Sequence, residues 1–364
     1  MKRRDFIKRS AAAGALLGVN SMFSCGTAKN KLKILVLGGT YFVGPAIVNA
    51  ALRNDHAVTL FNRGITNPEL FSGIRLIKGD REKGLAAYAP LKKEQWDVVI
   101  DVWPEKSKLV DEATTALMNH TKHYVFISSI AVYNSFQHPG LNEESEVVDL
   151  TLNPNEWEYP EEKLAAELFV KKRFQDNHTI LRAGPIKGWR DPAVDLLYWC
   201  VKLNREESIL APGSGLDHLQ FIDVNDVGRF AIQASAERIF GIYNCTGPKK
   251  EALLWKDFLE GTKQQFNSSS QLIWANEEFL ATNKISSFTD LPLWVPLSED
   301  GFMQISHEKL LQTGFAFTPI NKTLDDCMRW FTSSMDDHLK FGTEEVGLGL
   351  DRTKELELME KLQG

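Results

Sequence analysis

Short apolar runs alternate with stretches of helical spacing along most of the chain. The first run, 34–37, reads ILVL, with lysines before it and glycines after it. Similar runs lie at 56–64, 74–82, 96–103 and 123–133. Strands that alternate with helices predict a doubly wound parallel sheet, which binds its ligands at the carboxyl ends of the strands. We therefore expect an α/β fold built around such a sheet.

The start of the chain has a different pattern. The sequence RRDFIK, which begins at Arg3, resembles the twin-arginine export motif. A weakly apolar run rich in Ala and Gly follows, shorter than the roughly 18–20 residues that a membrane-spanning helix needs. We predict that residues 1–25 are a twin-arginine signal peptide read by the twin-arginine export machinery. The protein is then exported, and is either periplasmic or lipid-anchored on the outer side of the cytoplasmic membrane.

The four cysteines fall into two groups. Cys25 ends the sequence MFSC, which loosely resembles a lipoprotein cleavage box, so Cys25 is a candidate for lipidation. Cys200, Cys245 and Cys327 are scattered through apolar stretches, and we expect small buried core residues. Their spacing indicates neither a disulfide framework nor a zinc site, and no metal is expected.

The charge balance bears on partners. The whole chain has a formal net charge of −6. The signal region carries five basic residues and one acidic residue, so a chain that begins at Cys25 carries −10. Nucleic acid requires a basic surface, and we expect no nucleic-acid partner. A small anionic ligand in a local pocket remains compatible with this charge.

A glycine-rich sequence, GGTYFVG, follows the first predicted strand, and helical spacing resumes at 45–54. The order of strand, glycine turn and helix is typical of a dinucleotide site. The glycines permit a tight turn and close helix packing, and the helix N-terminus attracts a pyrophosphate. The candidate cofactor residues here are Gly38, Gly39, Thr40, Tyr41, Phe42, Val43 and Gly44.

This motif resembles the GGTGFxG of extended short-chain dehydrogenases/reductases, with Tyr41 in place of the middle glycine. The resemblance implies a Rossmann-type fold and NAD or NADP as cofactor. Asn62 and Arg63 end the second strand, where an acidic residue would favour NAD. Because Arg binds phosphate bidentately, the pair favours NADP, although Asn can also bond the hydroxyls of NAD. The resemblance further implies that Asp80 binds the adenine amino group.

The candidate catalytic residues are Ser129, Tyr159 and Lys163. Tyr159 and Lys163 are four residues apart on a predicted helix and therefore share one face. Free tyrosine, with a pKa near ~10, is a poor base, and a nearby lysine and an oxidised nicotinamide would favour its phenolate. Lys163 would also hold the nicotinamide ribose. Ser129 lies at the family's catalytic Ser/Thr position, and Tyr133 is the more structural tyrosine.

The resemblance covers about residues 32–335 and is nearest to the NAD-dependent epimerase/dehydratase group, which includes chloroplast stem-loop-binding proteins. The predicted organisation is a NAD(P)-binding domain at 32–186 and 217–247, a substrate lobe at 187–216 and 248–342, and a helical tail at 343–364. Arg190 and Asp191 are the candidate polar contacts to substrate. A stacking wall for sugars, or else core residues, is predicted at Trp189, Tyr198, Trp199, Trp274 and Trp294.

Three functions compete. The first is a sugar epimerase or dehydratase that returns its hydride within each cycle, with Tyr159 as acid/base. The second is an NADP-dependent carbonyl reductase or dehydrogenase, and the third is a non-catalytic binding protein related to RNA binders. Acidic charge and export both disfavour RNA. Because free nicotinamide cofactor is scarce outside the cytoplasm, the first function is favoured, with a cofactor kept through purification.

Overall fold

The computed structural model describes residues 31–102, 105–151, 153–247, 253–334, 339–344 and 346–364. Leu32–Gly364 forms one compact unit. The predicted signal peptide, with the lipidation candidate Cys25, lies outside the described residues. No helix in the described ranges is long and apolar enough to cross a membrane.

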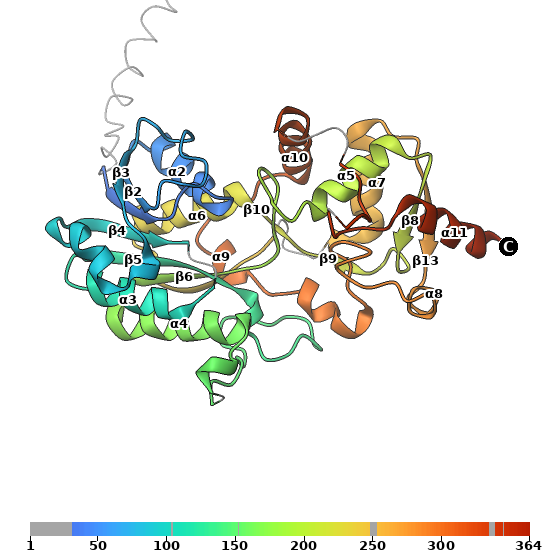
Figure 1. The fold of residues 1–364 in the computed structure, drawn as a ribbon. Helices are drawn as coiled ribbons and strands as arrows, with labels where there is room; N and C mark the ends of the chain where they lie inside the picture. The colour runs from blue at the N-terminus through green and yellow to red at the C-terminus, as the bar shows by residue number, and fades with distance from the viewer. Residues whose placement is uncertain (1–30, 103–104, 152, 248–252, 335–338, 345) are drawn as a thin grey trace, which may run out of the picture. The chain divides into compact units, whose positions relative to one another are not determined.

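A seven-stranded sheet forms the first part of this unit (Figure 1). Its strand order is β11-β6-β5-β4-β1-β2-β3, and every neighbouring pair is parallel. The prediction of a doubly wound, Rossmann-type parallel sheet is thereby confirmed. The strands are β1 (Lys33–Leu37), β2 (Ala57–Asn62), β3 (Arg75–Lys78), β4 (Trp96–Asp101), β5 (Thr121–Ser129), β6 (His178–Ala183) and β11 (Gly241–Cys245).

Helices cover both faces of the sheet because alternate side chains of each strand point to opposite sides. In β1, Ile34 and Val36 pack with α2 (Val43–Arg53) and α6 (Val224–Glu237). Leu35 and Leu37 pack instead with α3 (Ser107–Leu117) and α4 (Tyr159–Phe174), which lie on the other side in Figure 1. Short 3₁₀ helices occur at Arg81–Lys83, Leu85–Lys93, Ile130–Val132, Pro154–Glu156 and Leu297–Met303.

The second part has its own apolar core, formed largely by residues after 195. Its helices are α5 (Asp195–Arg205), α7 (Trp255–Phe266), α8 (Glu277–Thr282), α10 (Ile320–Ser334) and α11 (Arg352–Gln363). It contains two short strand pairs, β8 (Ser208–Pro212) with β13 (Gln271–Ala275) and β9 (His218–Leu219) with β12 (Leu253–Leu254). We call this part the C-terminal lobe. Helix α9 (Glu308–Leu311) and the pair of β7 (Ile186–Lys187) with β10 (Ile222–Asp223) pack instead against the sheet and α6.

Most aromatic residues of the predicted stacking wall lie in the core of this lobe. Tyr198 and Trp199 are 0 % exposed and Trp294 is 3 % exposed, so none of the three can offer a ring face to a sugar. Trp189 and Trp274 are half-buried. Of the two predicted roles, stacking wall or core, three of the five residues therefore have the core role.

The predicted helical tail contains α11, which is fastened to the lobe by a buried ion pair. Glu355 is 0 % exposed; its carboxylate pairs with Lys202 of α5 and accepts the Leu210 backbone N–H of β8 at 3.0 Å. Cys200, Cys245 and Cys327 are free thiols buried in the core, and burial raises the pKa of each.

Candidate active site

The glycine loop joins β1 to α2 and requires its glycines. Gly38 and Gly39 have φ of 113° and 98°, which other residues rarely adopt. A Cβ on Gly44 would lie 2.6 Å from the Gly39 Cα, closer than any real contact of this kind. The loop is thus held against the start of α2 at a distance that only glycine permits.

Tyr41, which replaces the family's middle glycine, points largely into solvent and is 60 % exposed. Its carbonyl oxygen accepts the Gly44 N–H at 3.0 Å, so the turn closes without a glycine at this position. Phe42 takes the unusual φ of 42° just before α2, and no side chain caps that helix. The Gly44 N–H is already bonded and Pro45 has none, so an anion at this helix start is favoured mainly by the helix dipole.

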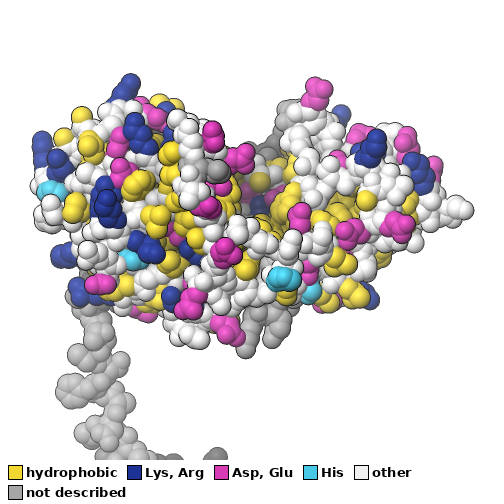
Figure 2. All heavy atoms as spheres, turned by 90° about the horizontal axis from the view of Figure 1, so that it is seen from below, with side chains coloured by type: hydrophobic (Ala, Val, Ile, Leu, Met, Phe, Trp, Pro, Cys, Tyr) yellow, Lys and Arg dark blue, Asp and Glu magenta, His cyan; other side chains and the backbone are white. Residues whose placement is uncertain are grey.

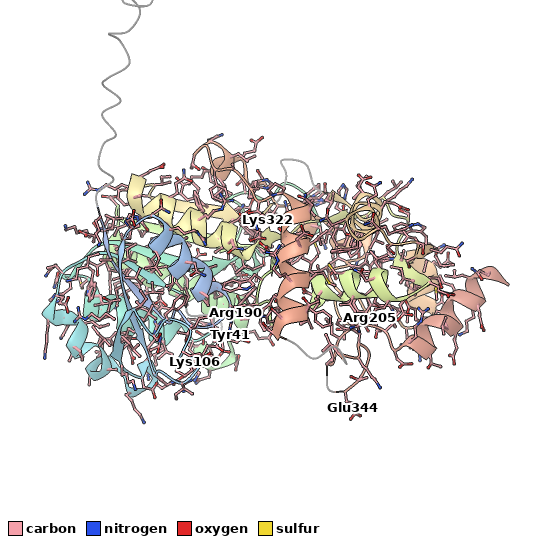
Figure 3. All side chains as sticks on the ribbon, turned by 90° about the horizontal axis from the view of Figure 1, so that it is seen from above. Tyr41, Lys106, Arg190, Arg205, Lys322 and Glu344 are labelled. Carbon is pink, nitrogen blue, oxygen red and sulfur yellow. The ribbon has the colours of Figure 1, made fainter. Side chains whose placement is uncertain are left out.

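A pocket of about 360 Å³ opens beside this loop. Its walls combine the predicted loop residues with residues after β2 and β4, and Tyr41 is labelled in Figure 3. The lining residues are Leu37, Gly38, Gly39, Thr40, Tyr41, Phe42, Val43, Asn62, Arg63, Gly64, Ile65, Thr66 and Val102. The close approach of backbone, the uncapped helix and Arg63 fit the phosphates of a dinucleotide.

Asn62 fastens the loop. Its Nδ2 donates to the Gly38 carbonyl oxygen at 2.7 Å, and its Oδ1 accepts the Gly64 N–H at 2.8 Å. A second amide, Asn67 Nδ2, donates to the Thr40 carbonyl oxygen at 2.7 Å. Sequence reasoning expected Asn62 to face the ribose and did not find Asn67. The side chain of Asn62 instead shapes the loop, which leaves Arg63 as the exposed polar group of this pair.

Asp80 caps a short 3₁₀ turn, where its carboxylate accepts the Glu82 N–H at 3.1 Å. It is not among the described residues that line the pocket. Its predicted bond to the adenine amino group therefore stays a prediction.

Ser129 and Tyr159 meet at the carboxyl end of β5. Ser129 is the last residue of that strand, and Tyr159 is the first residue of α4. Glu158 and Glu161 form a reciprocal capping box that fixes the start of α4, with Pro160 in its first turn. The Ser129 side chain lies near enough to the Tyr159 hydroxyl to lower its pKa, and Ser129 Oγ accepts the Ala131 N–H at 3.1 Å. Strand end and helix start thus place both residues together.

Desolvation raises the pKa of the Tyr159 hydroxyl, and the Ser129 side chain opposes that shift. The residue as a whole is 46 % exposed, so its ring reaches solvent while its hydroxyl faces the protein. Lys163 was expected to lower this pKa, yet its Nζ lies 5.9 Å from the centre of the Tyr159 ring. Among the chain's own groups, Ser129 is the one that lowers the pKa of Tyr159 and so favours its phenolate.

Lys163 is almost fully buried, at 2 % exposure. Its Nζ donates to the Ile127 carbonyl oxygen at 2.7 Å and lies 4.6 Å from the centre of the Phe126 ring. Burial lowers the pKa of Lys163 to about 8, against the opposing charges of Asp101 and Glu167. Because this pKa lies close to neutral pH, Lys163 gains or loses its proton readily when its surroundings change.

Glu167 is a buried residue that sequence reasoning missed. Its carboxylate accepts Ser128 Oγ at 2.6 Å and forms two bonds with the Arg182 guanidinium, at 2.8 and 3.1 Å. The contacts join α4, β5 and β6 beside Lys163. The position could have been found, because Glu167 lies one helical turn after Lys163 on the same face.

A second buried ion pair underlies β4. Arg81 contacts both carboxylate oxygens of Asp101, at 2.6 and 2.9 Å, and Tyr124 donates to the same carboxylate at 2.7 Å. Tyr88 accepts the Arg81 Nε–H at 2.9 Å, and burial raises the pKa of Tyr88 to about 12. Arg81 directly follows the predicted adenine contact but turns inward.

Tyr133 has a structural position, as expected. It is 2 % exposed, and its hydroxyl donates to Asn244 Oδ1 of β11 at 2.6 Å. The Arg182 guanidinium lies 5.0 Å from the centre of its ring.

The two predicted substrate contacts, Arg190 and Asp191, lie in different surroundings in the structure. Asp191 is 2 % exposed, and its carboxylate lies 3.4 Å from Lys187 Nζ. Burial and the neighbouring Asp195 raise the pKa of Asp191 to about 7. Arg190 is half-buried with φ of 63°, next to Trp189. Asp191 is better placed to hold this loop than to touch a ligand.

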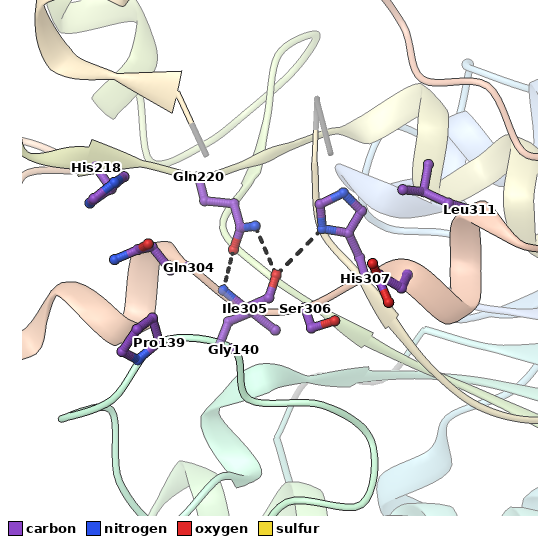
Figure 4. Close-up of a pocket in the computed structure, with 10 residues that line it drawn as sticks. Pro139, Gly140, His218, Gln220, Gln304, Ile305, Ser306, His307 and Leu311 are labelled. Atoms are coloured by element: carbon purple, nitrogen blue, oxygen red, sulfur yellow. Dashed lines mark hydrogen bonds between the residues drawn. The ribbon is translucent and has the colours of Figure 1, made fainter. Parts of the chain in front are cut away.

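A further cavity of about 490 Å³ lies between the loop at Pro139 and Gly140, strand β9, and the segment that begins at Gln304 (Figure 4). The buried amide of Gln220 exchanges two hydrogen bonds with the Ile305 backbone, each 3.0 Å long. Ser129, Tyr159 and Lys163 are not among its described lining residues.

Comparison with known proteins agrees with this geometry. The profile of the NAD dependent epimerase/dehydratase family matches residues 34–246. The chain belongs to this family, and it is an enzyme of the extended short-chain dehydrogenase/reductase type with a nicotinamide cofactor.

Individual relatives are more distant. The UDP-N-acetylglucosamine 4-epimerase of Methanobrevibacter ruminantium, solved with UDP-N-acetylmuramic acid, superposes with a TM-score of 0.61 at 21 % identity, over 84 % of this chain and 99 % of that one. The Bordetella bronchiseptica enzyme WbmH, solved with NAD⁺, gives 0.60 at 13 % identity, with coverage of 84 % and 99 %. The chloroplast stem-loop binding protein of 41 kDa b from Arabidopsis thaliana is 30 % identical over 120 residues, which span 29 % of this chain and 32 % of that protein.

Proposed function

We propose that the protein is an exported NAD(P)-dependent epimerase or dehydratase that acts on a sugar or sugar derivative, with Tyr159 as its acid/base. The observation that carries this proposal is that Ser129, the last residue of β5, and Tyr159, the first residue of α4, meet at the carboxyl end of the sheet. Ligands of parallel α/β sheets bind at this edge. The glycine pocket lies at the ends of β1 and β2.

Tyr159 would exchange a proton with the reacting hydroxyl of the sugar, while Ser129 orients that hydroxyl by a hydrogen bond. The residues that would hold the cofactor are those of the glycine pocket, together with Lys163. A nicotinamide held there would supply the acceptor and donor for a hydride of the substrate. Lys163, once drawn from the Ile127 carbonyl oxygen towards a ribose, would bring its positive charge to the Tyr159 phenolate and stabilise it.

The substrate class rests on the family and on export. A structural neighbour binds a nucleotide sugar. Nucleotide sugars are cytoplasmic metabolites, so the proposed export favours a free sugar, a glycoside or a sugar of the cell envelope. A cofactor regenerated within each cycle also suits a compartment without a nicotinamide pool.

Two alternatives remain testable. A carbonyl reductase could use the same three residues, and Arg63 in the pocket wall would suit its NADPH; it would consume added NADPH with each turnover. An RNA-binding role is suggested by the name of the chloroplast relative. Acidic and basic side chains are interspersed on the face seen in Figure 2, and the chain is acidic overall, which disfavours a phosphate backbone.

The proposal is tested by adding a panel of neutral, acidic and UDP-linked sugars to the enzyme as purified. Transient reduction of bound cofactor is followed at the nicotinamide absorbance band. We expect Tyr159→Phe to slow this reduction by about 100-fold or more, because a positioned acid/base contributes at least that much. Tyr243→Phe, which removes a hydroxyl that donates to the Phe240 carbonyl oxygen of the same chain segment, serves as a control. A Tyr159→Phe enzyme with the full rate would refute the assignment.

A further inference from the structure

A groove of about 300 Å³ lies on the helical face of α2 and α6, bounded on its other side by α10. Asn49 and Arg53 of α2 and Asn225 at the start of α6 form one wall. Asp326, Arg329, Trp330 and Ser333 of α10 form the other, and Trp189 also lines the groove. The groove shares no described residue with the glycine pocket and includes neither Ser129 nor Tyr159.

The loop that presents Trp189 is firmly built. It turns at Gly188, whose carbonyl oxygen accepts the Asp191 N–H at 3.2 Å. Arg190 adopts a φ of 63°, in the left-handed region that residues other than glycine rarely occupy. Lys187 anchors the loop from below, with its Nζ 3.4 Å from Asp191 and 2.6 Å from Asp195. Backbone strain held by buried ion pairs is typical of a functional segment.

Positive charge gathers around the groove. Asp326 of α10 is paired with Lys322 at 2.6 Å and with Arg329 at 3.1 Å, so two cations face one carboxylate. Lys322 lies towards the start of α10 (Figure 3). Arg53 is exposed on the opposite wall, and the Arg329 side chain is 72 % exposed. Arg53 and Arg329 thus outnumber Asp326, the one acidic side chain among the described lining residues, on a chain whose net charge is −6.

Two half-buried indoles stand among these cations. Trp189 and Trp330 each keep part of their ring surface open to the groove. The Arg190 guanidinium lies 5.6 Å from the Trp189 ring centre, which orients both groups and adds a further positive charge. Indoles bury apolar surface against flat ligands, and the C–H face of a sugar ring is such a surface.

We propose that this groove binds an acidic carbohydrate, a sugar chain that carries carboxylate or phosphate groups. Trp189 and Trp330 would stack on sugar rings, and Arg53 and Arg329 would pair with the anionic groups, since guanidinium matches both geometrically. Asn49 and Asn225 supply amides for ring hydroxyls. The groove is a second binding site, outside the catalytic one, and the proposal does not depend on the function proposed above.

The test is calorimetric titration of the full enzyme with trigalacturonic acid, maltotriose and inorganic phosphate. We expect trigalacturonic acid to bind more tightly than either of the others. Trp330→Ala and Arg329→Gln should each weaken that binding by about tenfold or more. Lys93→Gln removes an exposed cation from the Leu85–Lys93 segment and should change nothing. Unchanged bound-nucleotide content and an unchanged circular dichroism spectrum would show that each variant is folded.

Three outcomes would overturn the proposal. The first is no binding of trigalacturonic acid, and the second is equal binding of phosphate that Trp330→Ala does not alter, which would mark a simple anion site. The third is equal binding of maltotriose, which would exclude a role for charge. If phosphorylated trisaccharide also binds in a Trp330-dependent way, the groove accepts both anionic groups. Cofactor content is measured on the same samples, so a failure here is separable from a failure of the proposed reaction.

Discussion

Buried polar residues of the sheet domain and buried aromatic residues of the C-terminal lobe have different structural roles. We call the part that contains the seven-stranded sheet the sheet domain. In the sheet domain, Lys163 and Glu167 are buried beside Ser129 and Tyr159, and their contacts tie helix to strand at the candidate active site. In the lobe, the concentrated aromatic residues fill the core. Trp199 Nε1 donates to the Pro292 carbonyl oxygen at 2.8 Å, and its ring meets Trp255 edge-on at 5.0 Å.

This difference shows that a high content of aromatic residues is a poor predictor of a binding surface. Short motifs at strand ends are better predictors of a site. An indole in a loop-rich lobe is as useful for filling a core as for holding a sugar. A glycine between a strand and a helix has far fewer uses. The following predictions would break or sharpen the comparison, from the largest expected effect to the smallest.

Trp199→Ala should lower the free energy of unfolding by about 3–5 kcal/mol, because it removes a fully buried indole and leaves a cavity. Urea unfolding measures this loss, and the cofactor content of the remaining folded protein should be unchanged. Trp330→Ala, at a half-buried site, should cost about half as much or less. A small loss from Trp199→Ala would mean that the lobe aromatics are not its core.

Glu167→Gln should destabilise the protein by about 3 kcal/mol, since it leaves Arg182 buried without its charged partner. It should also slow cofactor reduction, because the two-bond contact with Arg182 that holds α4 against β6 is broken. Glu94→Gln, which breaks surface ion pairs with Lys33 and Arg75, should cost less than about 1 kcal/mol. If the two variants behave alike in urea, the buried contacts have no positioning role.

Gly44→Ala should weaken nucleotide binding by about tenfold or more, equivalent to about 1.4 kcal/mol, because the new methyl group meets the Gly39 backbone. Gly261→Ala in α7 is the matched control, since no described atom lies within 4 Å of its added Cβ. It should stabilise the helix by up to about 1 kcal/mol. Equal nucleotide affinity in both variants would contradict the predicted cofactor site.

The pH dependence of stability should carry the signature of Lys163. Its pKa is lowered to about 8 in the folded protein, while an unfolded lysine titrates near ~10.4. Between these values the unfolded chain binds more protons, so this residue makes the free energy of unfolding rise with pH, by up to about 1 kcal/mol per unit. Lys163→Met should lack this rise. Parallel profiles for the two proteins from pH 8 to 10 would argue against a buried, titrating Lys163.

Much of the sheet domain could be predicted because its signals are local. Apolar runs marked the strands, and a spacing of four placed Tyr159 and Lys163 on one helical face. Glu167 also obeyed that spacing but was overlooked beside a more familiar motif. Asn62 was placed correctly at the end of β2, yet its amide turned to the loop, since backbone groups of Gly38 and Gly64 were within reach.

The lobe was less predictable because its contacts join distant parts of the chain. Lys202 pairs with Glu355, 153 residues away, and Tyr198 packs against Phe341. No local pattern indicates such partners. Asp191 illustrates the consequence: its position after an apparent substrate loop was evident, but its burial by Lys187 and Asp195 depended on how the following helix packed.

The central claim is that the chain keeps its nicotinamide and regenerates it within each cycle. The most direct measurement is mass spectrometry and absorbance of the protein after purification and exhaustive dialysis. The account predicts close to one NAD or NADP per chain, with no net consumption of added NADPH during turnover. Protein that contains no nucleotide, and binds NAD(P)H only weakly when it is added, would contradict the claim.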